Sequence, residues 1–551
     1  MWIRQVFLGT VLLATLAGLG FAWLRPQPVD TPRSFDPQRY SRPDHAEVLA
    51  DVNRQWETHW RKTGVNPAPD AASLTICRRL ALALTGTIPS LEEIRQLQAV
   101  DPDQRVNWYV SRLLEDRRTA DYLAERLARS YVGTENGPFL VYRRRRFVSW
   151  LSDRLIQNQP YDQLVRDLIS DTGLWTDSPA VNFVTVTLDQ NNDNRPDPIR
   201  LAARTTRAFL GLRLDCLQCH DDHLGTVTLG SPAQPREGRQ LDFHRLAAFF
   251  GEVRSSPLGV RDSNSNPYSF QLLHDTEARP IEPTVPFAAE LLPPSSGQTQ
   301  RARLAAWVTH PRNQAFARAT VNRVWGLLCG KPLVEPIDQI PLWGEFPPGL
   351  ERLAQDWVDH RFDLHRLIRL IAASRPFQLD SRTDSGVTDE QEANWAVFPL
   401  SRLRPEQVAG GLIQATSLTT IDADSHVLWQ LRRFGEQTDF VKRFGDSSED
   451  EFSPPTGTVT QRLLMMNGQL VKERTKDDLV NNAATQIALL APTDEQAIEI
   501  AYLSILSRPP TREERDHFLA CFAEPPRRSR KLLLEDLCWV LLNGTEFGWN
   551  H

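Results

Sequence analysis

The chain has 551 residues, of which 41% are hydrophobic and 24% are charged, and its formal net charge is −6. This length allows at least two hydrophobic cores, and the composition is that of a folded globular protein rather than of a disordered or fibrous one. The small negative charge offers no general basic face, so we expect no nucleic-acid partner.

The first 24 residues read as a targeting segment. Arg4 precedes an apolar run from Val6 to Leu24, which Arg25 and Pro26 follow. A bilayer-spanning helix needs about 20 apolar residues, whereas the core of a cleaved signal peptide has ~7–15. We therefore favour a signal anchor over a cleaved signal peptide. In either case we expect the remainder on the periplasmic or cell-surface side, and as an anchor residues 6–24 would hold it to the inner membrane.

Residues 25–69 are rich in Pro, Asp and Arg and predict a linker that contains one short helix, Val48 to Trp60. Beyond it, Ser90 followed three residues later by Glu93 predicts a capping box at a helix start. Apolar residues then repeat at three and four positions in a long series of segments. In the first half the predicted helices are Leu74–Thr85, Arg105–Glu115, Ala120–Tyr131, Arg146–Gln157, Tyr161–Asp171, Ile199–Leu214 and Phe243–Val253.

The second half predicts further helices, ending at Ser529–Leu542, which Asn543-Gly544 closes. The only good strand candidate is the alternating stretch Phe183 to Leu188. The fold class is therefore mainly α, with two helical domains after an N-terminal membrane anchor and few short strands. We place the domains at residues 70–255 and 300–551, joined by a Pro- and Ser-rich connector at 256–299.

The run from Cys216 to His223 is rich in side chains that can ligate a metal ion, because it holds two of the six cysteines and two of the twelve histidines. Cys216, Cys219 and His220 have the Cys-x-x-Cys-His spacing of c-type haem attachment, in which the thiols form thioethers and the histidine ligates iron. With His223, the same residues could instead hold a single transition-metal ion. A third interpretation is a disulfide between the two cysteines.

A sixth iron ligand would come from elsewhere in the chain. The candidates are His244, His274, Met465 and Met466. The remaining cysteines lie in apolar helical segments and are expected in the core, although Cys521 and Cys538 could pair in an oxidising compartment.

A second candidate metal site follows the predicted strand. Asp189, Asn191, Asp193 and Asp197 place oxygen ligands at positions 1, 3, 5 and 9, the spacing of a calcium loop. Asn194 replaces the turn glycine and Arg200 stands where a bidentate Glu is expected, so a polar turn is the alternative interpretation.

Several ordered blocks of the chain resemble planctomycete cytochrome-associated proteins that pair the domains of unknown function fifteen-forty-nine and fifteen-fifty-three. These blocks include Arg79–Gly86, Asn158–Asp162, Phe209–Gly211 before Cys216, Leu246–Phe250, Val321–Trp325, Leu333–Pro336, Gln461–Asn467, Ser507–Thr511 and Trp539–Phe547. The resemblance covers roughly residues 70–550. It implies an exported, mostly helical protein whose Cys-x-x-Cys-His block is Cys216, Cys219 and His220, and it supplies no reaction.

One departure from the family pattern stands at the motif itself. The family reads Cys-His-Asp-His-Pro, whereas this chain has an additional aspartate, giving His220-Asp221-Asp222-His223-Leu224. The leading hypothesis is an exported, membrane-anchored protein with a cytochrome-c-like haem or metal site and a redox partner. The alternatives are a metal-dependent enzyme acting on an extracellular polysaccharide and a structural surface protein with a disulfide. No phosphate-binding loop or hydrolase motif assigns a reaction.

Overall fold

A computed structural model describes residues 43–134, 142–188, 195–256, 258–263, 267–422, 439–445, 458–467, 483–523 and 529–551, together with residues 425, 437 and 452. The predicted anchor at residues 1–24 and the linker up to residue 42 lie outside this part. Within it, no helix combines the length and apolar character needed to cross a bilayer. Residues Tyr40 to His551 cluster as one compact unit.

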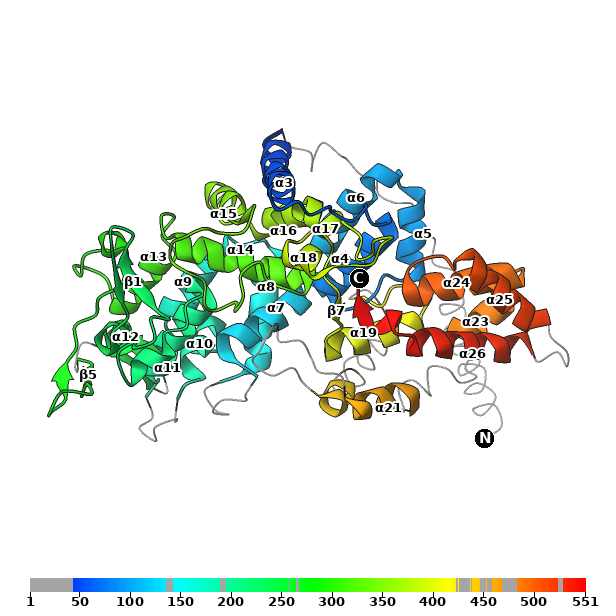
Figure 1. The fold of residues 1–551 in the computed structure, drawn as a ribbon. Helices are drawn as coiled ribbons and strands as arrows, with labels where there is room; N and C mark the ends of the chain where they lie inside the picture. Colours follow the sequence, from blue (N-terminus) through cyan, green and yellow to red (C-terminus); the bar gives the residue numbers. More distant parts are fainter. Residues whose placement is uncertain are drawn as a thin grey trace, which may run out of the picture. The chain divides into compact units, whose positions relative to one another are not determined.

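The unit is mainly helical, as predicted (Figure 1). Its first half contains α3 (Pro43–Thr63), α4 (Ser73–Thr85), α5 (Leu91–Ala99), α6 (Arg105–Glu115), α7 (Arg117–Val132), α8 (Arg144–Ile156), α9 (Tyr161–Ser170), α10 (Asn182–Thr185), α11 (Pro198–Thr205) and α12 (Gln240–Ala247). The second half contains α13 (Gln300–Val308), α14 (Gln314–Cys329), α15 (Leu350–Asp359), α16 (Leu364–Ala373), α17 (Arg375–Gln378), α18 (Asp389–Ala393), α19 (Pro405–Ala415), α21 (Val459–Asn467), α23 (Ala483–Leu490), α24 (Asp494–Leu506), α25 (Arg512–Ala523) and α26 (Arg530–Asn543).

The strands of the described residues form four antiparallel pairs, and each strand has at most four residues. They are β1 (Thr228–Ser231) with β2 (Gln234–Glu237), β3 (Val253–Ser256) with β4 (Gly259–Asp262), β5 (Ser269–Phe270) with β6 (Arg279–Pro280), and β7 (Ser401–Arg402) with β8 (Trp549–Asn550). The last pair joins positions far apart in the chain, because Ser401 pairs with Asn550.

Two local predictions met different outcomes. The capping box is confirmed: the Ser90 side chain accepts from the Glu93 amide, and the Glu93 carboxylate accepts from the Ser90 amide. The strand at Phe183–Leu188 is wrong, because α10 and a following turn occupy it. All six of its residues are buried, so its alternation of residue types does not divide a buried face from an exposed one.

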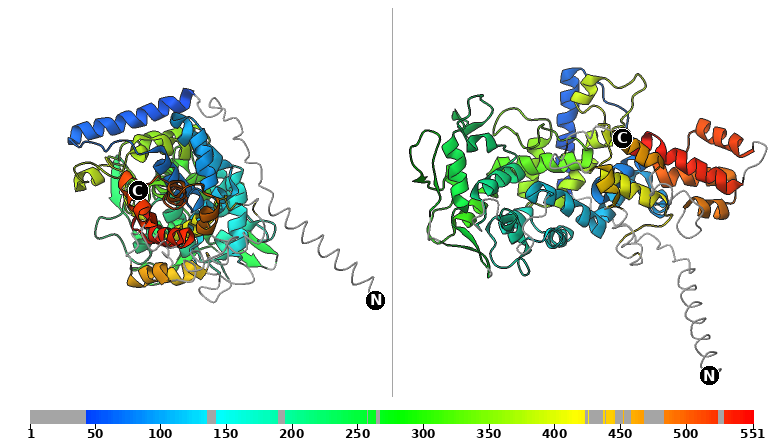
Figure 2. Two further views of the ribbon diagram at one scale, coloured as in Figure 1. Left: turned by 90° about the vertical axis from the view of Figure 1, so that its right-hand side faces the viewer. Right: turned by 90° about the horizontal axis from the view of Figure 1, so that it is seen from below.

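The hydrophobic cores draw residues from both halves of the chain. Leu82 of α4 and Ile88 lie in the same buried cluster as residues of α19, α23, α24 and α26, and Figure 2 shows the last three helices grouped beside one another. Elsewhere Trp56 of α3 stacks on Trp325 of α14, with ring centroids 6.1 Å apart. Burial of such surfaces stabilises a fold by about 25 cal/mol per Å² of apolar area, so each half stabilises the other.

Buried arginines and carboxylates add polar links between the halves. Arg79 of α4 donates to the carbonyls of Phe377, Leu379 and His551 at 2.7–2.8 Å, and its guanidinium lies 3.6 Å from the Phe398 ring centroid. Since a buried charge is tolerated only where hydrogen bonds satisfy it, these contacts fix α4 against the second half.

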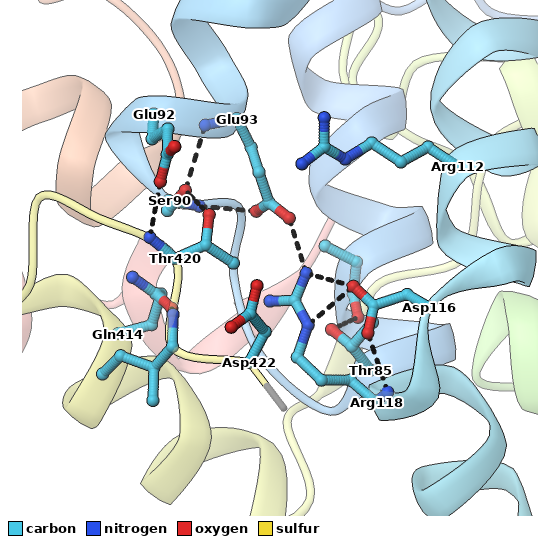
Figure 3. A network of polar contacts seen from close by, with 12 residues as sticks. Thr85, Ser90, Glu92, Glu93, Arg112, Asp116, Arg118, Gln414, Thr420 and Asp422 are labelled. Atoms are coloured by element: carbon cyan, nitrogen blue, oxygen red, sulfur yellow. Dashed lines mark hydrogen bonds and ion pairs between the residues drawn. The ribbon is translucent and has the colours of Figure 1, made fainter. Parts of the chain in front are cut away.

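The start of α5 makes another link (Figure 3). Glu93 there accepts from Arg118 at 2.6 Å, while Glu92 accepts from the amide of Thr420 at 3.0 Å. The Ser90 and Thr420 hydroxyls lie 2.8 Å apart. Arg118 also pairs with Asp116 at 2.7 Å. This polar network therefore joins helices α5 and α7 to the loop that follows α19.

Candidate functional site

The Cys-x-x-Cys-His motif lies on a short surface turn. A single 3-10 turn, Asp215–Gln218, carries Cys216, and Cys219 and His220 follow it directly. Leu217, between the cysteines, is fully buried, whereas Cys216, Cys219 and His220 are exposed. The buried leucine thus ties the turn to the protein while both thiols and the imidazole face outward. All six cysteines lie in the described part of the chain, and each is a free thiol.

His220 has a defined hydrogen-bonding arrangement. Its Nδ1 lies 2.7 Å from the backbone carbonyl of Asp221. A carbonyl can only accept, so Nδ1 carries the proton and the lone pair of the neutral ring is on Nε2. Histidine ligands of metals usually donate their second ring N–H to such a partner. His220 is therefore oriented as a ligand that would bind through Nε2.

The two aspartates after His220 hold the local backbone. The Asp221 carboxylate accepts from the amide of Gln240, the first residue of α12, at 2.7 Å. Asp222 is 4% exposed and accepts from the amides of Leu224 at 3.0 Å and Val227 at 2.6 Å. Burial opposes ionisation of Asp222, but these hydrogen bonds outweigh it and lower its pKa. The additional aspartate therefore anchors the loop that carries His223.

A second set of contacts fixes the Gln218 carbonyl, between the two cysteines. This oxygen lies 3.0 Å from Nε2 of His244 and 3.1 Å from the side-chain nitrogen of Gln240. Nδ1 of His244 lies 2.8 Å from the Tyr268 hydroxyl, and the ring stacks on Phe270 with centroids 3.6 Å apart. Because Nε2 must donate to the carbonyl, Nδ1 accepts from Tyr268. Burial lowers the pKa of His244 and favours this neutral form.

These contacts bear on the candidates for a sixth ligand. Both ring nitrogens of His244 have hydrogen-bond partners, so neither has a lone pair available for iron. Met465 is 8% exposed and packs in the core of the C-terminal helices, while Met466 is partly exposed on the same helix. His274 is exposed. Of these four residues, His274 alone offers an exposed imidazole.

The groups on the Cys216 turn can be compared with what a bare metal ion and a covalently attached haem would each need. Among the described residues, no group of three or more His, Cys, Asp or Glu side chains is gathered as a metal site. His220 and His223 have nearly parallel rings with centroids 6.0 Å apart. A structural zinc or iron ion needs about four converging ligands. Thioether attachment would use two thiols and one imidazole lone pair, and Cys216, Cys219 and His220 carry these groups. Partial loss of hydration around the Cys216 sulfur, followed by the nearby Asp222 charge, raises the pKa of this thiol.

The predicted calcium ligands fall partly outside the described residues. Asp189, Asn191 and Asp193 are not described, so the calcium loop stays a prediction. Asp197 is described and caps α11: its carboxylate accepts from the amides of Ile199 and Arg200 at 2.9 and 3.3 Å. Its side chain therefore has a helix-capping role.

Sequence reasoning missed the residues that support the turn. Gln240 and Tyr268 belong to no motif. Gln240 reaches the Gln218 carbonyl from α12, whereas Tyr268, directly before β5, supports that carbonyl only through His244. Asp222 stood out in the sequence as an insertion, and its hydrogen bonds explain its place. Leu217 gave a usable signal, since one apolar residue in an otherwise polar run commonly marks the buried point of a turn.

Comparisons with known families cover most of the chain. Residues 51–255 match the family model PSCyt2, described as a protein of unknown function (DUF1549). Residues 300–522 match the family model PSD1, described as a protein of unknown function (DUF1553). A search of curated proteins and a search of solved structures found no match. The candidate turn lies within the first matched region, and the chain belongs with the proteins that pair these two domains.

Proposed function

We propose that the chain is a cytochrome-like protein that carries one c-type haem on the Cys216–His220 turn. Cys216 and Cys219 are the attachment residues, and His220 is the iron ligand. The observation that carries the proposal is the state of His220. Its Nδ1 is held by the Asp221 carbonyl at 2.7 Å, which leaves the Nε2 lone pair available at the end of the segment that carries two exposed free thiols.

Attachment needs no external oxidant. Cys216 and Cys219 would each add across one vinyl group of the haem: a sulfur–carbon bond would form, and the other vinyl carbon would gain the thiol hydrogen. The bound iron would supply one-electron redox chemistry. The protein's own part is positional, since Leu217 anchors the turn while His244 and Gln240 hold its central carbonyl. Asp221 and Asp222 secure the flanking backbone in the same way.

The proposal includes export and membrane attachment. The apolar run from Val6 to Leu24 and the preceding Arg4 support an anchor in the inner membrane, with the two helical domains on the periplasmic or cell-surface side. Covalent haem attachment takes place on that side of the membrane, so the two parts of the proposal agree. A redox partner is the expected interaction.

The visible spectrum of the purified full chain tests the assignment. The chain is exported in a bacterial host that attaches c-type haem, and the protein is then extracted with acid acetone. We expect Soret and α bands that remain with the protein, that Cys216→Ser or Cys219→Ser weakens, and that Cys521→Ser leaves unchanged. A colourless protein with one equivalent of transition metal would support the metal-dependent enzyme instead. A colourless, metal-free protein with a Cys216–Cys219 disulfide would support the structural alternative.

A further inference from the structure

The segment that leads to Cys216 is held by the second matched domain. Helix α11 continues as a π-helical turn, Thr206–Leu210, and ends at Gly211. Arg323 of α14 donates to the carbonyl of Ala208 within this turn at 2.7 Å. Arg323 is itself 6% exposed. A π-helical turn leaves carbonyls displaced from the regular pattern, and here a buried side chain from residues 300–522 satisfies one of them.

A backbone contact follows immediately along the chain. The amide of Ile340 donates to the carbonyl of Gly211 at 2.9 Å, and Leu212 forms an isolated antiparallel bridge with Gln339. Gly211 has φ = 63°, and a Cβ there would lie 2.8 Å from Cδ1 of Ile340 and 3.2 Å from Cβ of Ala319. Both the backbone conformation and the close approach therefore require glycine.

Four side chains of alternating charge, Arg213, Asp338, Arg207 and Asp215, complete the attachment, and we call this set the Asp338 clamp. Arg213 donates to Asp338 at 2.9 Å, Arg207 lies 3.8 Å from the same carboxylate, and Arg207 donates to Asp215 at 2.6 Å. Asp338 is 8% exposed. Asp215 is the first residue of the 3-10 turn and directly precedes Cys216. The clamp thus runs from the second domain to the residue beside the first thiol.

We propose that the second domain forms part of the candidate site, with Asp338 as a positioning residue that fixes the Cys216 turn for its ligand. The Cys216 turn is held on one side by residues of its own domain, Gln240 and His244, and on the other by the Asp338 clamp. Residues 323–340 of the second domain supply part of the support of the turn. This shared support gives a structural reason for pairing the two domains in one chain. This inference depends on the proposed function only for the identity of the ligand that the turn binds.

The positioning role can be tested without haem, by the effective concentration of the Cys216 and Cys219 thiols. This quantity is the equilibrium constant for formation of the Cys216–Cys219 disulfide against glutathione. The full chain is prepared without haem, carries Cys521→Ser so that Cys216 and Cys219 are its only exposed thiols, and is equilibrated with reduced and oxidised glutathione. The pair gives up two electrons and two protons as its disulfide forms, and glutathione disulfide is reduced to two thiols. Mass spectrometry after acid quenching gives the ratio of the two forms.

We expect Asp338→Asn to lower this effective concentration by about threefold or more, because the substitution removes a partly buried ion pair. Arg213→Gln, at the more exposed end of the clamp, should act in the same direction and serves if Asp338→Asn does not fold. The control is Asp153→Asn on α8, which removes an exposed ion pair with Arg117 of α7 and should leave the value unchanged.

An unchanged effective concentration in a folded Asp338→Asn or Arg213→Gln variant would overturn the inference, even if the melting temperature falls. The haem assignment is tested separately, by whether the chain attaches haem. A chain that attaches no haem but loses effective concentration in these variants refutes the haem proposal alone. A chain that attaches haem with no change in effective concentration refutes the positioning role alone.

Discussion

The loop after His220 depends on one carboxylate, and Asp222→Asn tests that dependence. One Asp222 oxygen accepts from the amide of Leu224 and the hydroxyl of Thr226, while the other accepts from the amide of Val227 at 2.6 Å. Asparagine can keep the first oxygen, but its NH₂ group would then face the Val227 N–H. The substitution therefore removes one charge-assisted hydrogen bond and leaves a buried donor without an acceptor.

Loss of such a bond costs about 1.5–3 kcal/mol, which corresponds to roughly 10- to 100-fold faster local opening. Hydrogen exchange followed by mass spectrometry on the peptide that contains Val227 measures this directly. We expect the exchange to accelerate by that factor at pH 7, with helix α14 unaffected. Asp177→Asn, at an exposed position in the same domain, should change nothing. Unchanged protection of Val227 in Asp222→Asn would show that the carboxylate does not anchor the loop.

Three further predictions concern other residues of the chain. Arg79→Met should lower the free energy of unfolding by about 3–5 kcal/mol in a denaturant titration, because it removes the donor to two buried carbonyls and to one partly buried one. A loss below about 1 kcal/mol would contradict the proposed link between the halves. Burial lowers the pKa of His365 to about 4; the unfolded chain then binds the extra proton, so stability falls as the pH drops from about 6.5 to 4, and His365→Gln should remove about 1–3 kcal/mol of that loss. Tyr268→Phe removes the hydrogen-bond donor to Nδ1 of His244 and should shift the thiol–disulfide equilibrium of Cys216 and Cys219. His244→Gln can still donate to the Gln218 carbonyl and should shift that equilibrium less. Equal shifts in both variants would refute the idea that Tyr268 acts on Gln218 through His244.

Local sequence signals predicted much of the helical structure. Arg105–Glu115 has the predicted boundaries, and the predictions Leu74–Thr85 and Tyr161–Asp171 differ by one residue from α4 and α9. Ile199–Leu214 was expected as one helix, but it turns π-helical and ends before Gly211, which lies against Ile340. That end is set by a contact 129 positions along the chain, so no local pattern reports it.

The candidate site shows the same division. Cys216, Cys219 and His220 could be identified from spacing alone, because thioether attachment imposes that spacing. Their supports could not, since Gln240, Tyr268 and Asp338 reach the turn through packing between segments distant in sequence. Predicting such contacts would require the arrangement of both domains, which residue periodicity does not contain. The interpretation of domains as independent blocks at 70–255 and 300–551 stays a prediction, and the links through Arg79 show how closely the halves are joined.

The central claim is that this turn holds a covalently bound haem. Its most direct measurement is the intact mass of the exported full chain after denaturation, followed by mapping of the peptide that contains Cys216 to His220. We predict a mass increase of one haem that survives denaturation, localises to that peptide and disappears in the Cys216→Ser, Cys219→Ser double variant. A denatured chain without added haem mass, purified from a host that attaches haem to a control cytochrome, would contradict the account.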